Sequence, residues 1–151
     1  MKSVLFLCTG NYYRSRFAEE LFNFFAPTEC PGWVATSRGI AVDLGGNNVG
    51  PIARSTVEAL HQRGVQFNLS EARTPRQLVV SDLEAADHIV AVKYAEHSPL
   101  LRERFSSWPA LSDPSRIEFW HVHDTDVMTP QEALPLIEKL LSGLMRRLVN
   151  P

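Results

Sequence analysis

The sequence predicts an α/β fold built on a central sheet of four mostly parallel strands. Short apolar runs alternate along the chain with longer stretches in which apolar residues recur at helical spacing. This alternation is typical of parallel strands joined by crossover helices. The chain has 151 residues, 44% of them hydrophobic, which suffices for one apolar core. We therefore expect a single domain over residues 1–151.

Strands are expected at the apolar runs near residues 3–7, 33–37, 87–92 and 116–122. Helices fill the intervals, and the first should follow at about 15–26. The second should begin after Gly50, with Pro51 in its first turn, and end at Gly64. Weaker helical patterns cover about 75–85 and about 94–105, and Pro99 should interrupt or kink the latter.

The last helix has the clearest pattern. It begins with a capping-box signature, Thr129-Pro130-Gln131-Glu132. Apolar residues then share one face of the helix: Leu134, Ile137, Leu140, Leu141, Leu144, Met145 and Leu148. We interpret this element as a helix that packs on the core.

Composition argues against two classes of partner. The formal net charge of −2 shows no basic excess, so nucleic acid is not expected as a partner. The apolar run Val4 to Leu7 is too short for a signal peptide or a membrane span.

We expect a cytoplasmic protein without a membrane partner, in which Cys8 and Cys30 are free thiols. No pattern indicates an oligomeric state.

A cysteine and an arginine frame the loop expected after the first strand. The segment reads Cys8-Thr9-Gly10-Asn11-Tyr12-Tyr13-Arg14-Ser15. A strand, a tight loop and a helix in succession point backbone N–H groups and a helix N-terminus at one place, which binds anions. Arg14 could bind two phosphate oxygens, and the positive surroundings would favour the thiolate of Cys8. The cysteine–arginine spacing is weak evidence alone, but its strand, turn and helix context predicts a phosphate-binding loop.

Other segments should meet this loop at one edge of the sheet. Ligands of open parallel sheets bind beyond the carboxyl ends of the strands. The segments expected there are the loop at Cys8, then 37–39 and 43–50 after the second strand, and 123–126 after the fourth.

At this point the chain resembles the low-molecular-weight protein tyrosine phosphatases. The resemblance begins at Val4-Leu-Phe-Leu-Cys8 and continues through the loop to Ser15. It includes Ala18-Glu19, Ser37-Arg38-Gly39 and Asn48-Val49-Gly50-Pro51, in the family's order, and runs to the C-terminus. The resemblance implies a three-layer, Rossmann-like sandwich. It also implies a phosphorylated protein or small phosphomonoester as substrate, and neither a cofactor nor a metal.

The resemblance assigns roles to the loop residues. Cys8 would attack phosphorus in line with the leaving oxygen and form a phosphocysteine intermediate, which water then hydrolyses. Arg14 would bind the equatorial oxygens together with the backbone amides of the loop. Ser15 would stabilise the Cys8 thiolate, and Asn11 would brace the loop. The phosphate-binding residues are therefore Thr9, Gly10, Asn11, Tyr12, Tyr13, Arg14 and Ser15.

A carboxylic acid should protonate the leaving group, and three residues compete for this role. Asp113 precedes Pro114 as the family's general acid precedes its proline, but it stands before the fourth strand. Asp124 follows that strand, so we choose Asp124, with Asp126 next and Asp113 as a turn former.

Several residues depart from the family pattern around the expected substrate slot. Thr125, Asp126 and Val127 replace the residues that usually follow the acid, and Asn47 replaces an aromatic residue. Tyr12 could supply a wall in their place, so we expect Tyr12, Asn47 and Asp126 at the substrate rim. Further departures are Tyr13 in place of a second cysteine, Arg16 in place of proline and Lys93 in place of an acidic residue.

These departures leave alternatives open. The chain could be a phosphomonoesterase with a preference shifted from phosphotyrosine, or a phosphate-binding module that has lost turnover. Arsenate reduction would need Cys30 as a resolving thiol. A metal site at His121, His123, Asp124 and Asp126 is weakly indicated, and we expect none. Four arginines could extend a positive rim: Arg38, Arg54, Arg73 and Arg76.

Overall fold

Four parallel strands form the centre of the computed structural model, which describes residues 1–151. The strands are β1 (Lys2–Cys8), β2 (Trp33–Gly39), β3 (His88–Ala91) and β4 (Ile117–Phe119), in the order β2-β1-β3-β4. All three pairings are parallel. The register places Cys8 beside Gly39, so the loop after β1 and the segment after β2 leave the same edge of the sheet.

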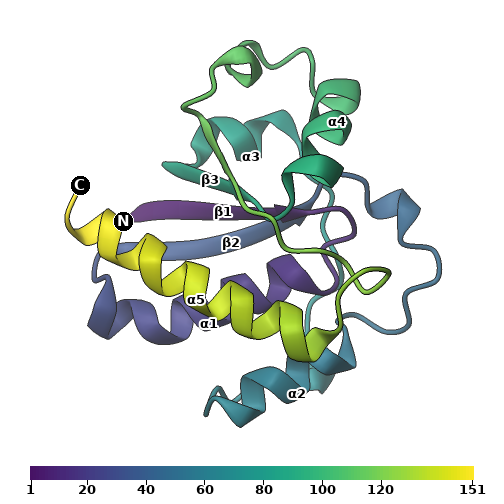
Figure 1. The fold of residues 1–151 in the computed structure, drawn as a ribbon, viewed down its shortest axis with the longest axis vertical. Helices are drawn as coiled ribbons and strands as arrows, with labels where there is room; N and C mark the ends of the chain where they lie inside the picture. The colour runs from purple at the N-terminus through teal and green to yellow at the C-terminus, as the bar shows by residue number, and fades with distance from the viewer.

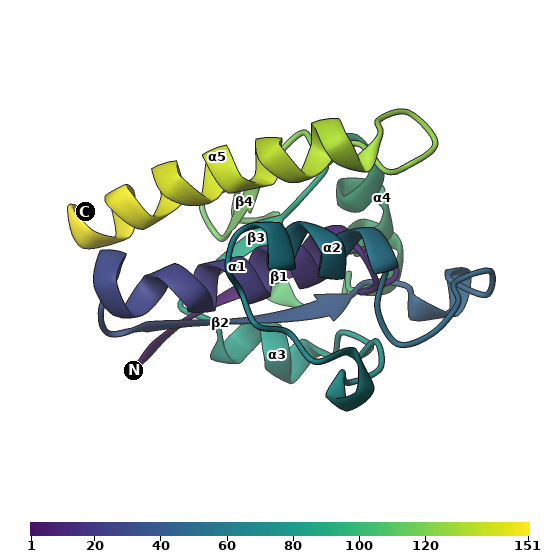
Figure 2. The ribbon, with the colours of Figure 1, turned by 90° about the horizontal axis from the view of Figure 1, so that it is seen from below.

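Helices cover both faces of this sheet (Figures 1 and 2). One face carries α1 (Arg14–Glu29), α2 (Arg54–Gln62) and α5 (Pro130–Val149), and the other carries α3 (Val80–Ala85) and α4 (Tyr94–Arg104). Short 3-10 turns lie at Val42–Leu44, Leu69–Glu71 and Pro109–Ser112. The predicted three-layer α/β sandwich is confirmed. No helix is both long and apolar enough to cross a membrane.

The apolar run of β1 is buried on both faces because helices cover both sides of the sheet. Side chains alternate between the two faces of a strand. Val4 and Phe6 belong to the apolar cluster under α1 and α5, whereas Leu5 and Leu7 belong to the cluster under α3 and α4. A strand buried on both faces reads as a continuous apolar run, as this one does.

Three predicted boundaries were wrong because contacts with distant segments set the backbone conformation there. The second helix begins at Arg54 and not at Pro51, because the backbone N–H of Ala53 donates to the carbonyl of Tyr12 in the loop after β1. Residues 75–79 precede α3 in extended form, since Leu78 N–H donates to Gly39 O at 2.8 Å.

The fourth strand ends at Phe119, short of the predicted residue 122. Beyond it, Trp120 N–H and Val122 N–H still donate to the carbonyls of Ala91 and Val92. These bonds carry the chain toward the end of β1, and they place residues 122–125 beside the loop that follows Cys8.

Candidate active site

The loop at residues 8–15, called the phosphate-binding loop after the prediction made from the sequence, turns around the sulfur of Cys8. Cys8 ends β1 and Arg14 begins α1. Asn11 adopts a positive φ of 52°, a conformation that asparagine tolerates better than most residues. Its backbone N–H donates to Cys8 Sγ at 3.3 Å, and Ser15 Oγ lies 2.9 Å from the same sulfur. The loop therefore directs donors at a nucleophilic atom.

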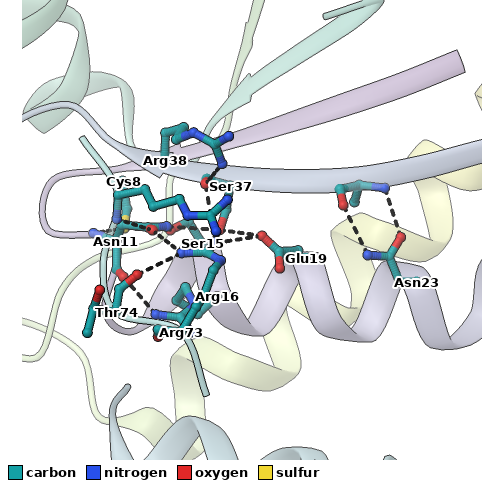
Figure 3. Close-up of polar contacts among 12 residues, drawn as sticks. Cys8, Asn11, Ser15, Arg16, Glu19, Asn23, Ser37, Arg38, Arg73 and Thr74 are labelled. Atoms are coloured by element: carbon teal, nitrogen blue, oxygen red, sulfur yellow. Dashed lines mark hydrogen bonds and ion pairs between the residues drawn. The ribbon is translucent and has the colours of Figure 1, made fainter. Parts of the chain in front are cut away.

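The side chain of Asn11 sets the direction of these hydrogen bonds (Figure 3). Its amide nitrogen donates to Ser15 Oγ and Ser37 Oγ, each at 2.9 Å. Because Ser15 Oγ accepts from Asn11, its own hydrogen is free to point at Cys8 Sγ. Asn11 is fully buried, so this arrangement is shielded from water. The contacts expected of Asn11 and Ser15 are therefore present, and their roles in the reaction stay predictions.

Two arginines brace the loop from outside, as Figure 3 shows. Arg73 donates to Asn11 Oδ1 at 2.9 Å and, through its other terminal nitrogen, to Glu19 Oε1 at 2.9 Å. Arg16 donates to the carbonyls of Pro51 and Arg73 at 2.9 and 2.8 Å. Burial and the charge of Arg73 lower the pKa of Arg16 to about 10. The two arginines join α1 to the segments at 51 and 73.

Arg14 is buried at the mouth of the loop. Its Nη1 and Nη2 donate to Glu96 at 3.3 and 2.8 Å, and Nη1 also donates to Val122 O at 2.9 Å. Burial opposes the charged form, but the hydrogen bond to Glu96 and the charges of Cys8, Glu96 and Asp124 raise the pKa of Arg14. Arg14 therefore remains a cation beside the sulfur.

A cavity of about 390 Å³ opens above Cys8 and Arg14. Its walls come from the phosphate-binding loop, the segment before α2, the first turn of α2 and the segment after β4. The lining residues are Cys8, Gly10, Tyr12, Tyr13, Arg14, Asn48, Ala53, Arg54, Ser55, Asp124 and Thr125. The predicted convergence of segments is present, but the contribution of α2 was not predicted. Ser37 and Arg38 lie outside the lining.

The three candidate acids differ in their position relative to the cavity. Asp124 lines the cavity with its Oδ2 3.6 Å from Arg14 Nη2, and its side chain is 46% exposed. Asp126 is exposed and does not line the cavity. Asp113 borders a different cavity and accepts hydrogen bonds from Ser115, as a turn-forming residue does.

The two loop tyrosines have different environments. Tyr12 is half-buried in the cavity wall, and its hydroxyl donates to Val49 O at 2.5 Å. Tyr13 is buried, its hydroxyl has no partner, and burial raises the pKa of Tyr13 to about 12. Asn47, expected at the rim, is exposed and lies outside the cavity lining. Of the expected rim residues, Tyr12 alone contributes to the cavity.

The remaining sequence hypotheses find little support in the geometry. No group of three or more histidine, cysteine, aspartate or glutamate side chains is arranged to hold a metal ion. Cys30 is fully buried, and burial raises the pKa of its thiol. It precedes β2, near the start of β1, whereas Cys8 stands at the opposite end of β1. A resolving role for Cys30 is therefore not supported by its position.

The four arginines of the predicted positive rim lie in different environments. Arg38 pairs with Asp82 at 3.4 Å, and Arg73 braces Asn11. Arg76 does not line the cavity, whereas Arg54 does and has no ion pair. One of the four arginines thus faces the site.

Sequence reasoning missed the part played by Glu96. The residue stands in the first turn of α4, directly after β3, and its side chain binds Arg14. The signal that could have found it is its place at the carboxyl end of a parallel strand, the edge at which the other site segments were expected.

Comparison with known proteins identifies the family of the chain. The family model described as low molecular weight phosphotyrosine protein phosphatase matches residues 3–149. The low molecular weight protein-tyrosine-phosphatase YfkJ of Bacillus subtilis (strain 168) is 33% identical over 93 residues. That alignment covers 61% of this chain and 56% of the relative, so it spans little more than half of the relative's length.

Solved structures extend the comparison over nearly the whole chain. The crystal structure of YfkJ from Bacillus subtilis aligns with a TM-score of 0.80 at 28% identity, covering 99% of this chain and 96% of that one. The low molecular weight protein tyrosine phosphatase from T. tengcongensis aligns with a TM-score of 0.71 at 26% identity, covering 99% of each chain. With Cys8 at the end of β1 and Arg14 at the start of α1, and with the family model matching residues 3–149, the chain belongs to the low molecular weight phosphotyrosine protein phosphatase family.

Proposed function

We propose that the protein is a cysteine-dependent phosphomonoesterase that hydrolyses phosphotyrosine in proteins through a phosphocysteine intermediate. The observation that carries the proposal is the convergence of Cys8, Arg14 and Asp124 on one cavity. Membership of the family and the descriptions of the relatives support the same reaction.

In the first step, Cys8 Sγ attacks phosphorus and the bond from phosphorus to the ester oxygen breaks. Asn11 N–H and Ser15 Oγ stabilise the thiolate before attack. The leaving oxygen takes a proton from the carboxyl group of Asp124, which lines the same cavity. The guanidinium of Arg14 and the loop amides bind the equatorial oxygens as their charge redistributes.

In the second step, water hydrolyses the phosphocysteine. The Asp124 carboxylate takes a proton from water, the water oxygen bonds to phosphorus, and the phosphorus–sulfur bond breaks. This returns the Cys8 thiolate and releases phosphate. No metal ion is needed, because Arg14 supplies the positive charge and Asp124 transfers the proton.

The cavity suits an aromatic phosphomonoester. Tyr12 gives one wall an aromatic surface, fixed by its hydrogen bond to Val49 O. Arg54 adds a positive charge at the same cavity, which favours a substrate with additional negative charge. We place the protein in the cytoplasm, where both cysteines would stay reduced.

The test is hydrolysis of an aryl phosphate and of a phosphotyrosyl peptide by the wild-type protein and by Cys8→Ser. We expect turnover by the wild type, loss of turnover in the variant, and a phosphoprotein trapped by rapid alkaline denaturation during wild-type turnover. Phosphate binding without product from either substrate would contradict the proposal and favour a phosphate-binding module.

A further inference from the structure

The hydrogen bonds of Arg14 use one edge of its guanidinium and leave another free. A guanidinium has five N–H groups in a plane. Glu96 accepts from both terminal nitrogens, Nη1 at 3.3 Å and Nη2 at 2.8 Å, and Val122 O accepts the second hydrogen of Nη1 at 2.9 Å. Neither Nε–H nor the adjacent hydrogen of Nη2 has a hydrogen-bond acceptor. These two N–H groups form the parallel pair that binds two phosphate oxygens.

The free edge belongs to the cavity. Arg14 is 2% exposed, yet it lines the cavity above Cys8. Asp124, which lines the same cavity, lies 3.6 Å from Arg14 Nη2, beyond hydrogen-bond length. Glu96 and Val122 therefore hold the guanidinium from the side away from this opening.

Glu96 is itself held by three groups. Its Oε2 accepts from Arg14 Nη2 and from the hydroxyl of Thr9 in the phosphate-binding loop, and it lies 3.0 Å from His97 Nε2. Burial raises the pKa of Glu96, whereas the interactions with His97 and Arg14 lower it by more. The pKa of Glu96 is therefore well below its ordinary value. The carboxylate is therefore ionised and fixed in place.

His97 supplies a donor of fixed direction. Its Nδ1 accepts from the backbone N–H of Lys93 at 3.0 Å, so the ring hydrogen is on Nε2, which faces Glu96. His97 is fully buried, and burial lowers its pKa against the opposing influence of Glu96. A neutral ring in this tautomer donates from Nε2, which lies 3.2 Å from Thr9 Oγ1 and 3.0 Å from Glu96 Oε2.

We propose that Glu96 is a positioning residue that orients Arg14, so that the Nε–Nη2 edge of the guanidinium faces a phosphate bound at Cys8. The inference rests on the proposed function for the identity of the bound group. Glu96 acts through Arg14 and does not touch the substrate. Because a misplaced guanidinium loses bidentate contact, Glu96→Gln should lower kcat/KM for an aryl phosphate about tenfold or more.

The first test measures binding of inorganic phosphate, which needs no turnover and so separates this proposal from the proposed reaction. Glu96→Gln should weaken phosphate binding about tenfold, while its melting temperature reports whether it is folded. Glu103→Gln is the matched control, since Glu103 is an exposed carboxylate on the same helix and its loss changes the net charge equally. Equal phosphate affinity in Glu96→Gln and Glu103→Gln would overturn the proposal. Tighter binding by Glu96→Gln would show that the carboxylate competes with phosphate, which also overturns it.

The second test observes the edge directly. In a proton–nitrogen NMR spectrum, the Nε–H signal of Arg14 is identified by its loss in Arg14→Lys. Saturating phosphate should shift this signal in the wild type, and in Glu96→Gln the shift should be smaller or the signal broadened. If the wild type binds phosphate but its Arg14 Nε–H signal does not shift, the Nε–Nη2 edge is not the one that binds phosphate, and the proposal is overturned.

Discussion

Arg73 Nη1 donates to Asn11 Oδ1 at 2.9 Å, although 62 residues separate the two in the chain. Asn11 in turn donates to Ser15, whose hydroxyl contacts the Cys8 sulfur. A residue outside the phosphate-binding loop thus helps to hold the conformation around the nucleophile. Only the fold brings this arginine to the loop.

Arg73→Gln should reduce activity by loosening Asn11. The variant removes the donor to Glu19 and one of two donors to Asn11 Oδ1, leaving the backbone N–H of Arg76 at 3.0 Å, so the positive-φ conformation of Asn11 loses part of its support. We expect kcat for an aryl phosphate to fall about tenfold, with a loss of about 1–3 kcal/mol of unfolding free energy. Arg147→Gln is the control, because Arg147 pairs with Glu118 at the surface of another part of the sheet. A fall of the same size in Arg147→Gln would mean that the effect is not specific to the loop.

Asp124→Asn and Asp126→Asn form a matched pair for the general acid. Both remove one carboxylate from the same segment, but only Asp124 lines the cavity. We expect Asp124→Asn to lower kcat for a phosphotyrosyl peptide by about 10²- to 10⁴-fold and Asp126→Asn to leave it nearly unchanged. The loss should be smaller for an aryl phosphate with an acidic leaving group, which needs less protonation. A larger loss of kcat in Asp126→Asn than in Asp124→Asn would identify Asp126 as the general acid.

Gly39→Ala should destabilise the protein because the new methyl group has no room. A Cβ at Gly39 would lie 2.6 Å from Val42 Cγ2 and 2.8 Å from the backbone oxygen of Thr9. Crowding of this kind costs about 1–3 kcal/mol, and it would press on the phosphate-binding loop. Gly46→Ala is the control, since a Cβ there meets nothing within 4 Å. In urea denaturation, Gly39→Ala should unfold at a lower urea concentration than Gly46→Ala. Equal midpoints would show that the loop accommodates the methyl group without loss of stability.

Glu20 should make stability fall as pH rises. Burial, followed by the negative charge of neighbouring Glu19, raises the pKa of Glu20 from 4.5 to about 7. At low pH Glu20 is protonated in the folded and unfolded states and costs nothing. As pH rises from about 4.5 through about 7, the unfolded state ionises more readily, so the folded state loses stability.

Glu20→Gln should therefore stabilise the protein at pH 8 by about 1 kcal/mol, after allowance for partial solvent screening, and change little at pH 4. Melting temperatures at the two pH values measure this difference. Glu58→Gln, at an exposed carboxylate on α2, should show no such change with pH. A Glu20→Gln variant that is no more stable than the wild type at pH 8 would contradict the expectation.

Local sequence patterns were sufficient to predict the elements whose conformation depends on neighbouring residues. The apolar run Val4 to Leu7 and the seven-residue apolar face after Thr129 correspond to β1 and α5. Predictions failed where a distant segment set the conformation. Pro51 lies outside α2 because its neighbourhood is tied to Tyr12 and Arg16 of another element.

The sequence by itself determined the α/β class, the loop at residues 8–15 between a strand and a helix, and the family, because a strand, a tight turn and a helix are encoded by neighbouring residues. The tertiary structure decided which charged groups serve that loop. Asp124 and Arg54 line the cavity, while Asp126 and Asp113 do not. It also brought Arg73 to Asn11 and Glu96 to Arg14, across 62 and 82 residues. Parallel crossovers gather segments from distant parts of the chain at one edge of the sheet, so partners across such distances are set by the packing and not by their spacing.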